Sequence, residues 1–350
     1  MSGLPMRWDR GPGTVWQVGR CGLRRQPRAL LAGALALGLA LATAALALQR
    51  GSIALPPSAV LAALLGQGDA GAAQVVLQIR LPRVLVALFA GAALGMSGAL
   101  LQSVARNPLG SPDVVGFTTG AATGAIAQIV LFDRGGIAVA LAALAAGLAA
   151  ALLVSWLAWR GGGGGQRLVL VGIGVGAVLG ALNDLMLVKG RLDTAIQANQ
   201  WLAGSLAARN WGHAAPLLLG VCGLAPPALA LAPRLAVLEL GDALAAQLGL
   251  PVERTRVLAV CTAVMLAALA TAAAGPIGFV ALAAPQLAAR LARGSGPCVF
   301  GAAAMGALLL SFADLLAQAL PIRASLPVGR MAALLGGMYL VWLLMRGRGA

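Results

Sequence analysis

Several residue types that carry chemistry are scarce in this chain of 350 residues, which has one lysine, one histidine and four cysteines. A phosphate-binding loop needs a lysine after its glycines, and Lys189 has no such context, so the chain cannot itself be an ATPase. His213 is the lone histidine, and the cysteines show no paired spacing. These residues cannot build a metal site, and neither a metal nor another cofactor is expected in this chain.

Charged residues are also scarce, at 10% of the sequence, whereas 60% is hydrophobic and the mean hydropathy is +0.91. A chain with so little polar surface cannot fold as a soluble globule, so its composition predicts an all-α polytopic membrane protein. The formal net charge of +15 would indicate nucleic-acid binding in a soluble domain. In a membrane protein, arginines of this kind belong to cytoplasmic loops, so membrane lipid is an expected partner and nucleic acid is not.

The sequence contains ten apolar segments that can cross a bilayer, whose hydrocarbon core of about 30 Å needs about 20 helical residues. They are residues 29–48, 84–104, 114–132, 137–159, 168–188, 216–231, 257–274, 279–291, 298–320 and 328–345. They predict one transmembrane domain over residues 29–346 with about ten helices. The shortest, at 279–291, is interrupted by Pro285.

The arginine-rich residues 1–28 lack apolar periodicity, so we expect a disordered basic tail. A basic start before an apolar run also fits a signal peptide, but the run is long and further spans follow, which favours an uncleaved first helix. If the segments alternate in direction, the larger share of the 25 basic residues falls on the side of both termini. The positive-inside rule therefore predicts that both termini lie in the cytoplasm.

Residues 80–124 are the most informative stretch, RLPRVLVALFAGAALGMSGALLQSVARNPLGSPDVVGFTTGAATG. Two arginines stand before an apolar run that ends at a proline-containing break, since proline lacks an amide proton and clashes with the preceding turn. Glycines at four-residue spacing on both sides of the break indicate close packing of neighbouring helices. The packing and pathway candidates here are Gly91, Gly95, Gly98, Asn107, Pro108, Gly116 and Gly120.

This stretch resembles the permease subunits of bacterial ATP-driven importers for iron-siderophores, haem and cobalamin (the FecCD type). Its amino-acid sequence is most similar to the ferric-enterobactin type. The resemblance covers nearly the whole chain. It implies a vitamin-B12-importer-like (type II ABC importer) fold in the bacterial inner membrane and alternating access driven by ATPase subunits, which bind the ATP and magnesium. It also implies a periplasmic substrate-binding protein and a second permease chain, either a related one or a second copy. A ferric siderophore is the expected substrate, with haem or cobalamin as the alternative.

The resemblance also indicates roles for residues outside this stretch. A short segment in the longest inner loop is similar to the ATPase-contacting segment of the family, and its apolar spacing and final glycine also suit a simple connecting helix capped by Asp242. The coupling candidates are Asp242, Leu244, Leu248, Gly249 and Leu250. A Gly-Pro-Ile-Gly hairpin adds the pathway candidates Gly275, Pro276 and Gly278.

Docking of the binding protein is expected at Arg80, Arg83 and Arg323, because guanidinium groups receive carboxylates well. Snorkelling of Arg80 and Arg83 at a helix end is the alternative. The chain departs from the family pattern at three positions, where relatives mostly carry histidine, arginine and glutamate: Gln286, Gln318 and Ser325. Without arginine at position 318, this chain would present its arginine pockets to the binding protein unequally. That would suit a heterodimer of this chain with a related permease.

Two other classes of membrane protein fit the sequence less well. An ion-coupled transporter normally keeps carboxylates near the middle of its spans, because charge there is costly unless it functions. The carboxylates recognised within the spans, Asp184 and Asp314, fall near outer helix ends. A membrane-embedded enzyme would need a nucleophile with a base or a metal cluster, and neither pattern occurs.

Overall fold

The apolar runs form helices because only a helix satisfies its own backbone N–H and C=O groups inside a bilayer. The computed structural model describes residues 15–18, 21–24, 27–51, 54–113, 116–160, 165–293, 296–320 and 326–346. Seven of the described helices are long and apolar enough to span a membrane. They are α1 (Pro27–Gln49), the continuous helix Ala70–Ala105, α6 (Ile137–Trp159), α7 (Gly165–Lys189), α9 (Trp211–Leu238), α11 (Val252–Ala274) and α13 (Val299–Ala319).

Three further apolar helices complete the predicted set of ten. They are α5 (Phe117–Ile126), which continues as the π-helix η2 (Ala127–Leu131), then α12 (Val280–Ala292) and α14 (Val328–Arg346). The continuous helix is longer than the expected second span, because α3 (Ala70–Gln74) and the π-helix η1 (Val75–Arg80) precede α4 (Leu81–Ala105). The all-α fold predicted from composition is confirmed for the membrane domain.

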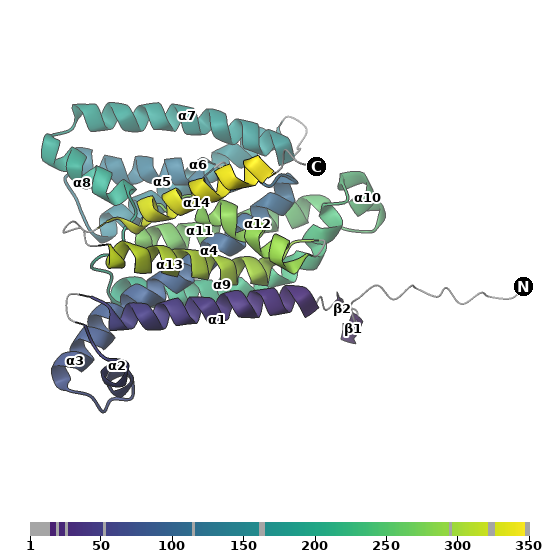
Figure 1. Ribbon diagram of the computed structural model, residues 1–350. Coiled ribbons are helices and arrows are strands. Elements are labelled where there is room, and N and C mark those ends of the chain that lie inside the picture. Colours follow the sequence, from purple (N-terminus) through teal and green to yellow (C-terminus); the bar gives the residue numbers. More distant parts are fainter. Residues whose placement is uncertain are drawn as a thin grey trace, which may run out of the picture.

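The bundle has two ends that differ in the short helices they carry (Figure 1). One end, called the α8 end, carries α2 (Pro57–Leu64), α3 and α8 (Leu192–Leu202). The other, called the α10 end, carries α10 (Asp242–Gln247), the start of α1 and the end of α14. The first and last spans therefore begin and finish at the same end, as an even number of crossings requires.

Part of the expected disordered tail has regular structure. Strands β1 (Val15–Val18) and β2 (Cys21–Arg24) pair antiparallel, with Val15 opposite Arg24. The remaining residues before Pro27 lie outside the described part of the chain, so disorder there stays a prediction.

The core of the bundle surrounds α4, which packs against α13, α11, α9 and α12. In the most apolar window of the continuous helix 78% of residues are buried, against 17% in α7. The peripheral helices instead expose leucines such as Leu35, Leu170 and Leu219. Apolar side chains on the outside of a bundle suit contact with lipid tails or with another membrane subunit, not with water.

Candidate functional site

The α10 end carries a short helix held by a carboxylate between two arginines. The prediction that Asp242 caps α10 is wrong, because the N-cap residue is Gly241 and no side chain caps the helix. The Asp242 carboxylate instead accepts hydrogen bonds from Arg106 at 3.0 Å and Arg256 at 2.9 Å. Arg106 directly follows α4 and Arg256 lies in the first turns of α11. The contact therefore ties α10 to two core helices.

The coupling candidates on α10 divide into exposed and anchoring residues. Leu244 and Leu248 are 53% and 66% exposed, whereas Ala245 between them is fully buried. Gly249 ends the helix with φ +81°, a conformation that favours glycine, and Leu250 packs against the main core. The result is a rigid apolar projection at one end of the bundle. Surface leucines held in this way are suited to a protein contact.

The proline-containing break after α4 is fixed by side-chain hydrogen bonds. Arg106 ends α4 in the left-handed region, at φ 48°. The Asn107 Oδ1 atom accepts the Leu109 backbone N–H at 2.9 Å, and the Pro108 carbonyl accepts Gln286 Nε2 at 2.9 Å. Gln286, where relatives mostly carry histidine, therefore ties α12 to the break between α4 and α5.

A carboxylate outside the predicted candidates, Asp113, lies between two short spans. Asp113 ends the break before α5, and its Oδ1 atom accepts the Thr118 hydroxyl. A Cβ added to Gly278, just before α12, would lie 4.0 Å from Asp113 Oδ2. Both α5 and α12 are too short to span alone, so their connecting backbone enters the bundle, which membranes tolerate only where protein or water surrounds it. Polar groups at such positions are candidates for a transport pathway.

The Gly-Pro-Ile-Gly hairpin joins three segments through backbone contacts. Gly275 has φ +77°, and Ser205 N–H donates to the Ala274 carbonyl at 2.9 Å. A Cβ on Gly204 would clash with the Pro276 carbonyl, so this approach needs glycine. Gly329 N–H in turn donates to the Gly204 carbonyl at 3.2 Å. The hairpin, the end of α8 and the start of α14 therefore form one closely packed unit.

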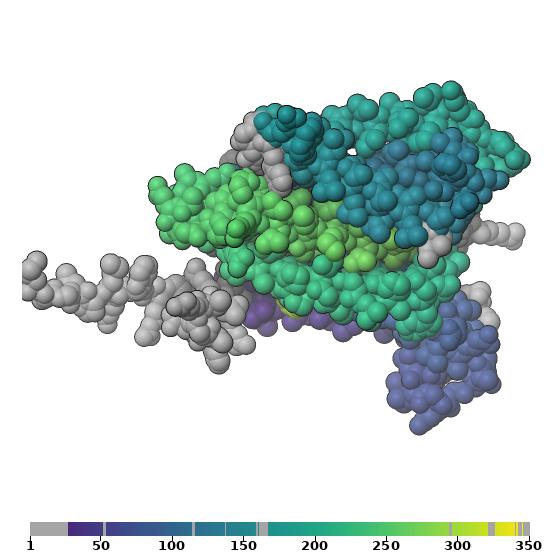
Figure 2. Space-filling view, turned by 180° about the vertical axis from the view of Figure 1, so that it is seen from behind, coloured from purple at the N-terminus to yellow at the C-terminus, as the bar shows by residue number. Residues whose placement is uncertain are grey.

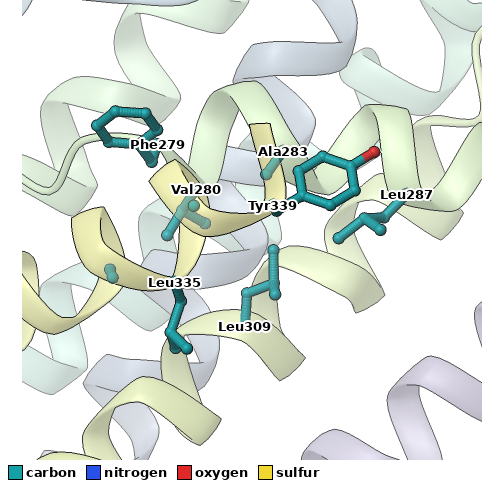
Figure 3. A pocket seen from close by; sticks show the side chains of 9 residues that line it. Phe279, Val280, Ala283, Leu287, Leu309, Leu335 and Tyr339 are labelled. Atoms are coloured by element: carbon teal, nitrogen blue, oxygen red, sulfur yellow. The ribbon is translucent and has the colours of Figure 1, made fainter. Parts of the chain in front are cut away.

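Phe279 completes this unit by packing on α14 (Figure 3). A Cβ on Gly336 would lie 2.5 Å from the Phe279 Cβ, so the two helices approach at a glycine. The adjoining space between Phe279, Leu309 and Tyr339 has a volume of about 30 Å³. That volume suits at most a water or two, so this space is a packing defect and not a substrate site.

The predicted packing glycines lie at close helix crossings. An added Cβ would collide with the carbonyl of Gly306 at Gly91, of Ala302 at Gly95 and of Ala281 at Gly98. On α5, a Cβ at Gly120 would collide with the Ala150 side chain and the Ala146 carbonyl of α6, and Gly116 begins the helix with φ +79°. Small residues let backbones approach where the membrane supplies no hydrophobic driving force between helices. The seam between α4 and α13 is therefore built on glycine.

The α8 end places the predicted docking arginines in two different environments. Arg80 is only 8% exposed, and its Nη1 atom donates to the Leu48 carbonyl at 2.8 Å. Arg83 is 29% exposed and pairs with the nearly inaccessible Asp314 at 2.8 Å. Gln318, where relatives mostly carry arginine, also donates to Asp314, at 2.7 Å. Arg80 thus lies inside the protein in this structure, and Arg83 reaches the surface. Arg323 and Ser325 lie outside the described residues.

Comparisons with known proteins agree with this arrangement. Residues 39–346 match the FecCD transport family. The chain is 47% identical over 302 residues to the ferric enterobactin transport system permease protein FepG of Escherichia coli (strain K12), covering 85% of this chain and 91% of that one. It is 39% identical over 342 residues to the achromobactin transport system permease protein CbrC of Dickeya dadantii (strain 3937), covering 95% and 97%.

A solved structure has the same fold. It is an inward-facing conformation of a metal-chelate type ABC transporter, and the two chains superpose with a TM-score of 0.80 at 28% identity, covering 91% of this chain and 99% of that one. The fold, the ordered motifs and the extent of the match lead to one conclusion: this chain belongs to the FecCD transport family of membrane permeases.

Proposed function

We propose that this chain is the permease subunit of an ATP-driven importer that moves an iron(III)-siderophore complex from the periplasm to the cytoplasm. The observation that carries the coupling to ATP is the α10 projection, where Leu244 and Leu248 are exposed on a helix that Asp242 anchors to Arg106 and Arg256. A force applied to those leucines would reach α4 and α11 through charge-assisted hydrogen bonds, which are stronger than neutral ones. The α10 end is then the cytoplasmic end.

The siderophore assignment rests on relatives that are named for ferric enterobactin and achromobactin. Uptake of radiolabelled ferric enterobactin, haem and cobalamin in a bacterial strain that lacks only this subunit tests it. We expect the chain to restore ferric-siderophore uptake at least tenfold above background and to leave haem and cobalamin uptake unchanged. Restoration of haem or cobalamin uptake alone would overturn the siderophore assignment.

A second permease chain is expected to cover α7 and α14. Helix α7 is the least buried of the seven long spans. Helix α14 borders an open apolar groove of about 460 Å³ beside Leu334, Met338 and Val341. Such faces fit another membrane subunit as well as lipid. The partner is proposed to be a related chain and not a second copy. Gln318 replaces an arginine that would contribute to the surface for the binding protein, so a partner with a different surface is expected. Native mass spectrometry of the purified transporter would reveal two different permeases; two copies of this chain would contradict the heterodimer.

The substrate-binding protein is proposed to dock at the α8 end, where Arg83 and Arg330 have exposed or partly exposed side chains. Cations at this surface would steer the carboxylates of a partner, an effect that salt screens. Arg330→Glu should slow binding-protein association at low ionic strength more than at high ionic strength. Equal association rates for Arg330→Glu and the wild-type chain at low salt would contradict docking through this residue.

A further inference from the structure

A cavity of about 600 Å³ opens between α6, α8, α9 and α11. The two helices at its sides, α6 and α9, do not pack closely against each other along the described bundle, whereas α11 packs against both. Figure 2 shows α11 between them on this face of the molecule. The volume lies within the range of ligand pockets, roughly 300 to 1,000 Å³. None of the transport residues described above lines this cavity.

The depth and position of the cavity match one leaflet of a membrane around the spans. Its walls in the spans come from the first two turns of α6, the first two turns of α9 and the last two turns of α11, all near the α8 end. About eight helical residues at roughly 1.5 Å each give a depth of about 12 Å, which is close to half of a hydrocarbon core of about 30 Å. An acyl chain entering from the α8 end would therefore fit its depth.

The walls and the mouth of the cavity differ in chemistry. The deeper walls are apolar, with Leu144, Leu217 and Leu269 among the side chains. The polar lining residues Gln197, Arg209 and His213 come from α8, the α8–α9 connection and the first turn of α9. Trp201 also lines the cavity, and tryptophan favours the interface between headgroups and acyl chains. An apolar interior below a polar, cationic mouth matches an amphiphile with a negative headgroup.

Arg209 supplies the charge that selects this headgroup. Its Nε atom donates to the Ser205 carbonyl at 3.0 Å, which fixes one edge of the guanidinium. No carboxylate lines the described part of the cavity, and Arg209 forms no ion pair with any described residue. Burial lowers the pKa of the Arg209 guanidinium, so a nearby anion would replace part of the lost hydration. A phosphate accepts guanidinium donors well, often with two parallel hydrogen bonds.

We propose that this cavity is a binding site for one anionic glycerophospholipid of the leaflet at the α8 end, with its phosphate at Arg209 and an acyl chain along α6, α9 and α11. The site is separate from the transport residues and does not depend on which substrate the permease carries. A bound lipid would fill a cavity that the protein leaves open in the membrane.

The test uses the complete purified transporter in nanodiscs of phosphatidylcholine with a small fraction of phosphatidylglycerol. After transfer into detergent, mass spectrometry counts the retained lipids. We expect the wild-type protein to retain about one phosphatidylglycerol per copy of this chain and Arg209→Gln to retain roughly tenfold less, since the variant loses the charge-assisted hydrogen bonds to the phosphate. Arg191→Gln is the matched control, because Arg191 is also at the α8 end but is 80% exposed and away from the cavity.

Two further measurements keep the proposal falsifiable if Arg209→Gln assembles poorly. Ala140→Phe fills the cavity without changing charge and should also reduce retained phosphatidylglycerol. In the wild-type transporter, phosphatidylglycerol with a photoactivatable acyl chain should label peptides from the starts of α6 and α9. Labelling elsewhere on this chain, equal retention of phosphatidylcholine, or unchanged retention in Arg209→Gln would each overturn the proposal.

Discussion

The carboxylate of Asp242 lies 2.9 Å from the guanidinium of Arg256, although their side chains are 41% and 4% exposed. The short helix at the surface is thereby connected to a buried cation in α11. Arg256 also donates to Glu253 at 2.7 Å, and Arg106 reaches the other oxygen of Asp242. This arrangement can transmit movement of α10 to the core.

Asp242→Asn should weaken this connection. A buried arginine that loses a charged partner is destabilised, and because Glu253 remains we expect a loss of about 1 to 3 kcal/mol in unfolding free energy. Transport should fall further than ATP hydrolysis, because the ATPase would act on a loosened helix. Thermal unfolding and uptake by reconstituted transporters measure both effects. Asp193→Asn is the control, since its contact with Arg191 is 4.0 Å long and exposed; similar losses in both variants would contradict the assignment.

Gln286 should be replaceable by histidine but not by leucine. Its amide donates to the Pro108 carbonyl, and a histidine ring N–H can make the same kind of bond, whereas Gln286→Leu would leave that carbonyl without this donor. We expect uptake near the wild-type rate for Gln286→His and a several-fold decrease for Gln286→Leu. Equal uptake by both variants would show that this hydrogen bond has no part in transport.

Gly95→Val should prevent correct assembly of the bundle. The added side chain would collide with the backbone of α13 at Ala302, and backbone cannot move as a flexible side chain can. Gly38→Val in α1 is the matched control, because a Cβ there meets nothing within 4 Å. Yield of monodisperse protein from the membrane is the readout. Comparable yields of the two variants would refute the glycine seam.

Asp314 and Arg83 should behave as a coupled pair. Asp314→Asn leaves Arg83 without its charged partner, so we expect a loss of about 1 to 3 kcal/mol in unfolding free energy. Combining it with Arg83→Gln should recover part of that loss, because neither residue of the pair then carries a charge. Thermal unfolding of the three variants measures the coupling. A double variant less stable than either single variant would contradict it.

The sequence predicted the spans well because about 20 apolar residues in a row have few alternatives in a bilayer. It also located the breaks, since proline and glycine act locally. It missed the continuation of α4 back to Ala70, where glutamine and alanine give no clear membrane signal but suit a helix. It also missed that α9 extends from Trp211 to Leu238, beyond the predicted span 216–231 at both ends, and stays helical through Pro233.

The side-chain contacts of the candidate site could not be predicted from the sequence. Asp242 and Arg106 are 136 residues apart, and nothing local marks them as partners. The sequence left Arg80 as a docking residue or a snorkelling one, and its hydrogen bond to the Leu48 carbonyl inside the protein depends on how α1 packs against the start of α4. In the sequence, Asp113 is only the last residue of the proline-containing break. Asp113 and Thr118 are polar residues five positions apart, beside a helix that is too short to span the membrane. That pattern could have identified Asp113 as a candidate.

The central claim, that α10 docks an ATPase subunit, is tested most directly by purifying the transporter with Leu244→Glu and measuring the ATPase that remains bound. Leu64→Glu is the matched control, because Leu64 is also an exposed leucine of a short helix but lies at the α8 end. The account predicts that Leu244→Glu loses most of the bound ATPase while the permease stays folded in the membrane, and that Leu64→Glu keeps it. Full ATPase binding by Leu244→Glu would contradict the account.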